Sequence, residues 1–183
     1  GALDGVALIR FFGHFYSGKI KFLVNDLLMH IKPLAPVFLP INKYGSQAKE
    51  SSLQINNAYE SDEQMLIFPA GLCSRLQHGK IKDLEWKKTF IAKAVQSQRD
   101  IIPIYFEGRN STFFYRFAQI RKCIGLKFNI ELIYLPDEMF NSKNKTFDIY
   151  IGKPIPWQTF DKSKSLQEWA QIVKEKVYQI KKN

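Results

Sequence analysis

Cysteine, histidine and long apolar runs are all scarce in this chain of 183 residues. Two cysteines, Cys73 and Cys123, are too few for a disulfide framework and fit a reducing compartment. The three histidines show no metal-ligand spacing, so we expect no metal site. No run of about 18 apolar residues occurs, and no signal peptide is recognisable, which excludes a membrane-spanning helix and a secretory leader within these residues.

Aromatic residues and positive charge, by contrast, are plentiful. Hydrophobic residues make up 45% of the chain and charged residues 24%, which is ordinary for one folded domain over residues 1–183. Aromatics reach 14% and the net charge is +10. The charge favours an anionic partner, such as phosphate groups, nucleic acid or an acidic lipid surface, although a basic surface kept for solubility would look the same.

Hydrophobic periodicity predicts alternating strands and helices. We expect helices over 4–12, 22–30, 46–59, 86–95 and 165–182, and strands over 37–41, 65–68, 101–106, 130–135 and 147–151. Ser165 and Glu168 fit a capping box at the start of the last helix. This order predicts an α/β fold with a mostly parallel central sheet flanked by helices.

Ligands of such sheets bind at the carboxyl ends of the strands, which here are residues 42–45, 69–75 and 107–111. The second of these segments belongs to Phe68–Arg75, which reads FPAGLCSR. A strand entering a Pro-x-Gly turn frees backbone amides that can face an anion, and Arg75 adds a bidentate cation. A plain strand-to-loop turn is the alternative interpretation.

Phe68–Arg75 also resembles the FPEGTRS block of the glycerolipid (lysophospholipid) acyltransferase family, which includes the 1-acylglycerol-3-phosphate acyltransferases. Three further segments resemble other blocks of the family in the same order. Gly1–Gly5 is similar to the end of the His-x4-Asp motif, as in the bacterial hemolysin-like branch. Leu39–Lys43 is similar to a strand that ends in a basic residue, and Ile101–Ile104, followed by Gly108, to the fourth block. The resemblance covers most of residues 1–155.

This resemblance implies acyl transfer and a role in phospholipid biosynthesis. In the family, a histidine acts as general base on the acceptor hydroxyl, which attacks an acyl thioester, and an aspartate orients that histidine. Asp4 matches the aspartate, although it could also cap a helix. The histidine is expected upstream of Gly1, so we expect that the sequence is an N-terminally truncated part of the domain.

The resemblance also implies where the substrates bind. Lys43 and Arg75 would hold the acceptor head group, and the turn containing Pro69, Gly71 and Ser74 would bind the acceptor or the developing oxyanion. No bound cofactor is expected, because the thioester of coenzyme A or acyl carrier protein is itself a substrate. The implied location is peripheral, on an anionic membrane surface at the cytoplasmic face of the inner membrane, with no nucleic-acid partner.

Two positions depart from the family pattern. Ala70 replaces the usual Glu, and Lys43 replaces the usual Arg, which exchanges a bidentate fork for a point charge. These departures make an amino-acid lipid, such as a monoacylated ornithine or glycine lipid, an alternative acceptor to lysophosphatidic acid.

The segment from Phe113 to Phe128 mixes aromatic and basic residues. That composition is typical of a surface lying on an anionic bilayer, and equally of a core helix with a basic outer face. Stacking on single-stranded nucleic acid is a weaker alternative, because no nucleic-acid-binding motif accompanies the segment.

Two other functions stay open at this stage. The chain could be a non-catalytic basic lipid-binding module, or a Cys73-dependent hydrolase with His30 or His78 as base. The hydrolase is disfavoured because Cys73 does not lie in a nucleophile elbow. The third histidine, His14, lies among aromatic residues and is interpreted as a packing residue. The acyltransferase hypothesis requires Asp4 to share one crevice with Lys43 and Arg75.

Overall fold

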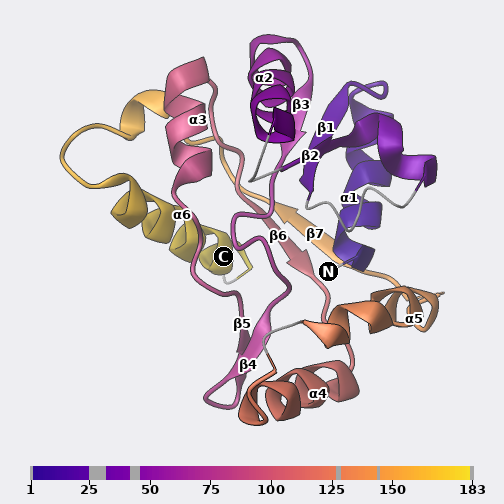
Figure 1. Cartoon of the computed structure of the whole chain (residues 1–183). Helices are drawn as coiled ribbons and strands as arrows, with labels where there is room; N and C mark the ends of the chain where they lie inside the picture. The colour runs from indigo at the N-terminus through magenta and orange to yellow at the C-terminus, as the bar shows by residue number, and fades with distance from the viewer. Residues whose placement is uncertain (1, 25–31, 42–45, 127–128, 144, 182–183) are drawn as a thin grey trace.

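A small parallel sheet with helices against it forms the first part of the chain, and antiparallel strand pairs follow (Figure 1). The computed structural model describes residues 2–24, 32–41, 46–126, 129–143 and 145–181. The parallel sheet has the order β2-β1-β3, with β1 at Ile20–Val24, β2 at Phe38–Pro40 and β3 at Gln64–Leu66. The connections are η2 (Lys32–Val37) and α2 (Ser46–Glu60). The predicted α/β class is therefore confirmed.

Strand β1 corrects the predicted helix over 22–30. Ile20, Phe22 and Val24 are buried and alternate with partly exposed residues, which is the period of two that a strand requires. The strand pairs in parallel on both sides, with Phe22 opposite Phe38 in β2 and Leu66 in β3. Residues 25–30 of the predicted helix lie outside the described residues.

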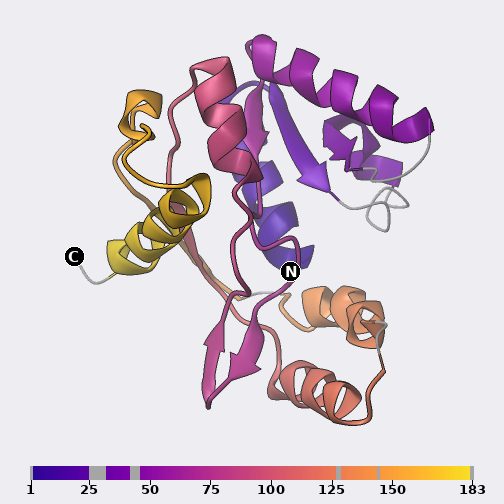
Figure 2. The same cartoon turned by 60° about the vertical axis from the view of Figure 1, so that its left-hand side comes forward.

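Helix α1 (Ala2–Phe15) packs its apolar stripe against this sheet. Leu8, Ile9 and Phe12 are buried on it, and they form one cluster with Ile20, Phe22, Val24, Phe38 and Leu66. The helix predicted over 4–12 is thus confirmed and is longer at both ends. Its first turn, which contains Asp4, lies at the end that points away from α2 in Figure 2.

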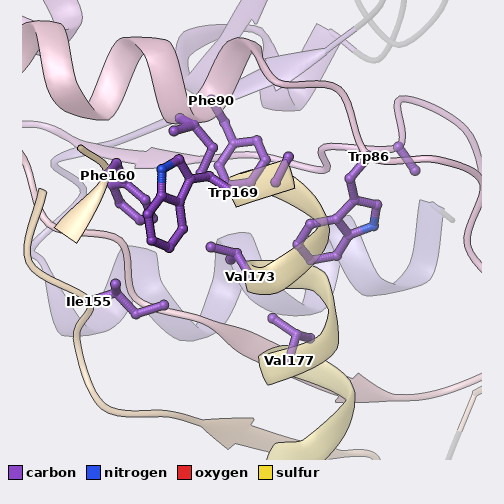
Figure 3. Packing of buried hydrophobic residues seen from close by; sticks show 10 residues of the cluster. Trp86, Phe90, Ile155, Phe160, Trp169, Val173 and Val177 are labelled. Carbon is purple, nitrogen blue, oxygen red and sulfur yellow. The ribbon is translucent and has the colours of Figure 1, made fainter. Parts of the chain in front are cut away.

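A second core lies between α3 (Thr89–Ser97) and α6 (Leu166–Ile180), with α6 also contacting β6 (Ile104–Glu107). Strand β6 pairs antiparallel with β7 (Asp148–Ile151). Trp169 of α6 meets Phe160 edge-on at 5.7 Å, and Val173 and Val177 share one buried cluster with Trp86 and Phe90 (Figure 3). Between β7 and α6 lies η4 (Trp157–Thr159).

The capping box at the start of α6 is confirmed. The Ser165 hydroxyl accepts from the Glu168 amide at 3.2 Å, and the Glu168 carboxylate accepts from the Ser165 amide at 2.7 Å. Both bonds satisfy amide donors that a helix start leaves without partners inside the helix.

The remaining elements form a third part, lowest in Figures 1 and 2. Their bounds are β4 (Arg75–Gln77), β5 (Lys80–Lys82), α4 (Thr112–Cys123), η3 (Ile130–Tyr134) and α5 (Leu135–Phe140). The β4–β5 hairpin turns at His78 and Gly79, whose φ values of 49° and 75° are those of a type I′ turn. Sequence analysis did not predict this hairpin.

The strand predicted over 130–135 is wrong, because these residues form η3 and the start of α5. Ile130 and Ile133 are exposed, whereas Glu131 is fully buried between two arginines. A side-chain requirement set by distant arginines therefore overrides the local preference for a strand. Within the described residues, no helix combines the length and apolar character needed to cross a bilayer.

Candidate active site

A large cavity of about 2130 Å³ is lined by many segments of the chain, among them the start of α1 and the segments that follow β3 and β6. Pro69–Ser74 and Glu107–Ser111 both line it. Two of the three loops expected at the carboxyl ends of strands thus meet at one cavity, as predicted. The third, residues 42–45, lies outside the described residues, and with it Lys43.

Asp4 lines this cavity from the first turn of α1 and is partly buried. One carboxylate oxygen accepts from the Gly5 amide at 3.0 Å, and the positive end of the helix dipole stabilises the negative charge. A Cβ added to Gly5 would lie 3.6 Å from the Phe22 ring and 3.8 Å from the Phe68 ring. The start of α1 is therefore packed against the beginning of the FPAGLCSR segment.

Tyr115 of α4 lies close enough to Asp4 for the carboxylate to affect the pKa of its phenol. Burial raises the pKa of the Tyr115 phenol, the bond from the Asn110 amide opposes the rise, and charge on Cys73 and Asp4 adds to it. The Asn110 amide donates to the phenol oxygen at 3.2 Å. The two cavity loops, α1 and α4 thus converge around Asp4.

The turn at Gly71 is tight and carries a lysine above it. Gly71 has φ +70°, in the region that favours glycine, and its amide donates to the Phe68 carbonyl at 3.0 Å. That amide is therefore not directed at a substrate oxyanion in this structure. A Cβ at Gly71 would lie 3.0 Å from Lys87 Nζ, and the Lys87 amide donates to the Pro69 carbonyl at 3.0 Å. The Lys87 ammonium thus lies over the turn, and Lys87 lines the cavity.

Ser74 lines the cavity, and its hydroxyl donates to Asp83 Oδ1 at 2.6 Å. The other Asp83 oxygen accepts from Trp86 Nε1 at 3.1 Å. Since Trp86 is buried in the second core, these bonds fix the end of the FPAGLCSR segment to that core. The sequence predicted Ser74 as a substrate-binding residue, and the structure adds this positioning contact.

The predicted crevice contains Asp4, Pro69, Gly71 and Ser74, but the Arg75 side chain is directed elsewhere. Its guanidinium donates to the Cys73 carbonyl at 3.0 Å and pairs with Glu131 at 2.7 Å. The meeting of Arg75 with Asp4 in one crevice therefore stays a prediction. The Arg75 guanidinium turns to Glu131 because a fully buried carboxylate requires positive partners.

Glu131 pairs with a second cation, because Arg121 Nε lies 2.8 Å from its other oxygen. Arg75, Glu131 and Arg121 thus form a buried ionic triad, which joins β4, η3 and α4. The role of Arg75 as head-group ligand stays a prediction, and Lys87 and Arg109 are exposed cations that do line the cavity. Sequence analysis did not single out these two. The sequence did contain one indication that cations near Lys87 could bind an anion, because residues 75–99 carry a net charge of +5.

The cysteine-hydrolase alternative finds little geometric support. Cys73 lines the cavity and is partly buried, but His78 is exposed at the tip of the β4–β5 hairpin and is not a lining residue. His30 lies outside the described residues. In the described part of the chain, no group of His, Cys, Asp and Glu could hold a metal ion.

A family model described as acyltransferase matches residues 1–183. The chain belongs to the acyltransferase family. The family resemblance that was stated on four sequence segments is thereby confirmed.

Two curated relatives of this acyltransferase-family chain are each named lyso-glycine lipid O-acyltransferase. The protein of Bacteroides thetaiotaomicron is 56% identical over 180 residues, and that of Phocaeicola vulgatus is 54% identical. The alignments cover 98% of this chain but 66% and 64% of the relatives, so the chain spans less than two thirds of their length.

Among solved structures, the 1-acyl-sn-glycerophosphate (LPA) acyltransferase of Thermotoga maritima is similar, with a TM-score of 0.51 at 15% identity. The match covers 90% of this chain and 58% of that structure. At this identity the likeness concerns the fold, and it agrees with the α/β arrangement described above.

Proposed function

We propose that this chain is part of an O-acyltransferase that moves a fatty acyl group from a thioester to the hydroxyl of a lyso-aminolipid. A lyso-glycine lipid is the acceptor that we favour, supported by 56% identity to a protein of that name. The observation that carries the proposal is that Asp4 and the Pro69–Ser74 turn line the same cavity. That is the arrangement needed for a base–orienter pair next to an acceptor site.

The proposed step is one acyl transfer. A histidine of a His-x4-Asp motif, upstream of Gly1, takes the proton of the acceptor hydroxyl while its oxygen attacks the thioester carbonyl. The new C–O ester bond forms, the C–S bond breaks, and the departing sulfur receives the proton from the histidine. Asp4 orients the imidazole and stabilises its positive charge during the transfer. The helix dipole of α1 keeps negative charge favourable at that position.

The acceptor head group is proposed to lie over the Gly71 turn. Lys87 presents a compact positive charge there, which suits the single carboxylate of a glycine head group. Ala70 offers no polar side chain, and the bidentate fork of Arg75 is engaged by Glu131. A phosphate head group, which benefits from bidentate contacts, would not find the Arg75 fork over this turn, although the arginine Arg109 lines the cavity.

The donor is proposed to be a coenzyme A or acyl-carrier-protein thioester, with the enzyme peripheral on the cytoplasmic face of an inner membrane. The test uses the full-length protein with each thioester and with either monoacylated glycine lipid or lysophosphatidic acid, and mass spectrometry of the diacylated product. A diacylated glycine lipid as the preferred product is expected. Preference for lysophosphatidic acid would contradict the proposed acceptor while leaving acyl transfer intact.

Asp4→Asn tests the catalytic assignment in the same assay. Loss of the orienting charge is expected to lower kcat by about 10²–10⁴-fold, the range typical of positioned proton transfer. The thermal unfolding curve should stay unchanged. Asp62→Asn, on the surface, is the matched control. Undiminished turnover of the Asp4 variant would refute its role.

Lys87→Ala tests the head-group contact, with the adjacent Lys88→Ala as control. Because a hydrogen bond to a charged group contributes about 1.5–3 kcal/mol, KM for the glycine lipid should rise roughly 10-fold or more in the first variant. The second should change little, since Lys88 is exposed and is not a lining residue. Equal effects of both substitutions would point to general surface charge instead.

A further inference from the structure

Helix α4 has apolar residues on two sides, which is unusual for a helix at the surface of a domain. Its inner side buries Phe114, Tyr115 and Ala118. The opposite stripe repeats every three or four residues and is formed by Phe113, Phe117, Ile120 and Ile124, called here the outer face. Ile120 and Ile124 of the outer face are 59% and 65% exposed.

Exposed apolar residues concentrate in this region. Half of the large hydrophobic side chains that are exposed in the described residues lie between Phe113 and Phe140. On the outer face, the rings of Phe113 and Phe117 stack at 5.8 Å, and Tyr134 of η3 meets both edge-on at 5.4 and 5.6 Å. The rings are thus ordered although they face outward. A shallow groove of about 350 Å³ runs along them, lined by Thr112, Phe113, Arg116, Phe117 and Ile120.

The charge on α4 and on the residues that flank it in sequence has one sign, while Glu138 of α5 accepts from the Ser111 amide at 2.6 Å at the start of the helix. Residues 109–126 contain Arg109, Arg116, Arg121 and Lys122 and no acidic residue. Arg121 is paired with Glu131, and the other three are exposed. Ordered apolar side chains with exposed cations nearby match the chemistry of an anionic lipid surface, whose acyl region accepts the rings and whose head groups accept the cations.

The groove adjoins the large cavity, because Thr112 and Arg116 line both. We propose that the outer face of α4 docks on an anionic lipid bilayer and that a lipid acceptor passes from there along the groove into the cavity. The route of the acceptor rests on the proposed function, whereas the docking does not. A second copy of this chain is a poorer occupant, since a two-fold contact through this face would set cations of the same sign against each other.

The docking is tested with a local probe in the full-length protein. Ile120→Trp places an indole on the outer face, and vesicles of phosphatidylcholine and phosphatidylglycerol carry bromine in their acyl chains. We expect strong quenching of the added fluorescence, and weaker quenching when phosphatidylglycerol is left out. Leu53→Trp is the matched control, because Leu53 is 60% exposed on α2, at the opposite end of the molecule (Figure 1). Equal quenching of both variants, or none at Ile120→Trp, would overturn the proposal.

Two further measurements separate the alternatives. If Ile120→Trp emission shifts to the blue with protein concentration and resists quenching by vesicles, the face joins two copies and the bilayer proposal fails. Ile124→Ser, at an outer-face residue that does not line the groove, should lower turnover of a vesicle-embedded acceptor about tenfold, as expected for removal of one buried apolar side chain. It should leave turnover of the same acceptor in detergent micelles unchanged. Failure of the proposed acyl transfer would abolish turnover in both media, yet leave the quenching in place.

Discussion

Helices α6 and α4 begin in the same way but are held to the molecule by different forces. Each has a serine at its N-cap, Ser165 and Ser111, whose hydroxyl accepts from an amide of the first turn. Helix α6 then buries a purely apolar stripe of Trp169, Ala170, Val173 and Val177. Helix α4 is fixed on its inner side by apolar residues and by the ionic triad of Arg75, Glu131 and Arg121.

The contrast between the apolar stripe of α6 and the ionic triad at α4 shows what each kind of contact contributes to the fold. Apolar burial contributes free energy in proportion to area but specifies position loosely, whereas a buried ion pair contributes little net free energy and tolerates no loss of a partner. The triad links α4 and η3, which are close in sequence, to β4, which is distant from both. We infer that it sets the position of α4 beside the cavity, while the core at α6 provides stability.

The largest effect is expected at α6. Trp169→Ala should lower the free energy of unfolding by about 3–5 kcal/mol, because it opens a cavity in the second core. It also removes the bond from the indole Nε1 to the Asp161 carbonyl at 3.1 Å. Denaturant unfolding of both proteins measures the difference. Trp157→Ala is the control, and its only partly buried side chain should cost less. Equal losses would mean that α6 is not the main source of stability.

The same contrast explains what the sequence predicted. Helix α6 and its capping box depend on neighbours within one or two turns, so periodicity and the Ser165–Glu168 spacing were sufficient. Strand β1 was taken for a helix because its five residues are too few to establish a period of two in an apolar stretch. The 130–135 segment was taken for a strand because its long-range pairing with Arg75 is invisible in local sequence.

The site follows the same rule. Pro69, Gly71 and Ser74 were expected in the crevice because they follow the carboxyl end of a strand, and the family resemblance added Asp4; all four line the cavity. Arg75 was expected there too, but its partner lies 56 residues away in sequence. Lys87 joins the site through a close approach to Gly71, which no spacing rule describes.

A smaller but more local effect is expected at the triad. Glu131→Gln removes the charge between Arg75 and Arg121 and should destabilise by roughly 3 kcal/mol, the lower end for a broken buried pair, because glutamine still accepts a hydrogen bond. Amide hydrogen exchange should accelerate in α4 and η3 before α6.

Replacing all three members of the triad by apolar residues of similar size sharpens this test. The triple variant should regain the stability that Glu131→Gln loses, because replacing a buried ion pair by well-packed apolar side chains is often neutral or stabilising. Glu175→Gln, on the exposed side of α6, serves as the control and should change little. Uniform acceleration of exchange across α4 and α6 would show that the two helices are one cooperative unit and would remove the distinction between them.

The smallest effect is expected on the outer face of α4, and it bears most directly on why the two helices differ. Ile120→Ser should change the free energy of unfolding by no more than about 0.5 kcal/mol without lipid, because a side chain that is 59% exposed has little packing to lose. Val173→Ser on α6 makes the same kind of substitution at a side chain that is only 2% exposed, and it should lower the free energy of unfolding by roughly 3 kcal/mol. Denaturant titrations of both variants provide the measurement.

A loss above about 1.5 kcal/mol for Ile120→Ser would mean that the outer face is packed in the folded protein, since a substitution at an exposed position seldom costs that much. The apolar stripe would then serve stability, as it does in α6, and would no longer be available to a bilayer.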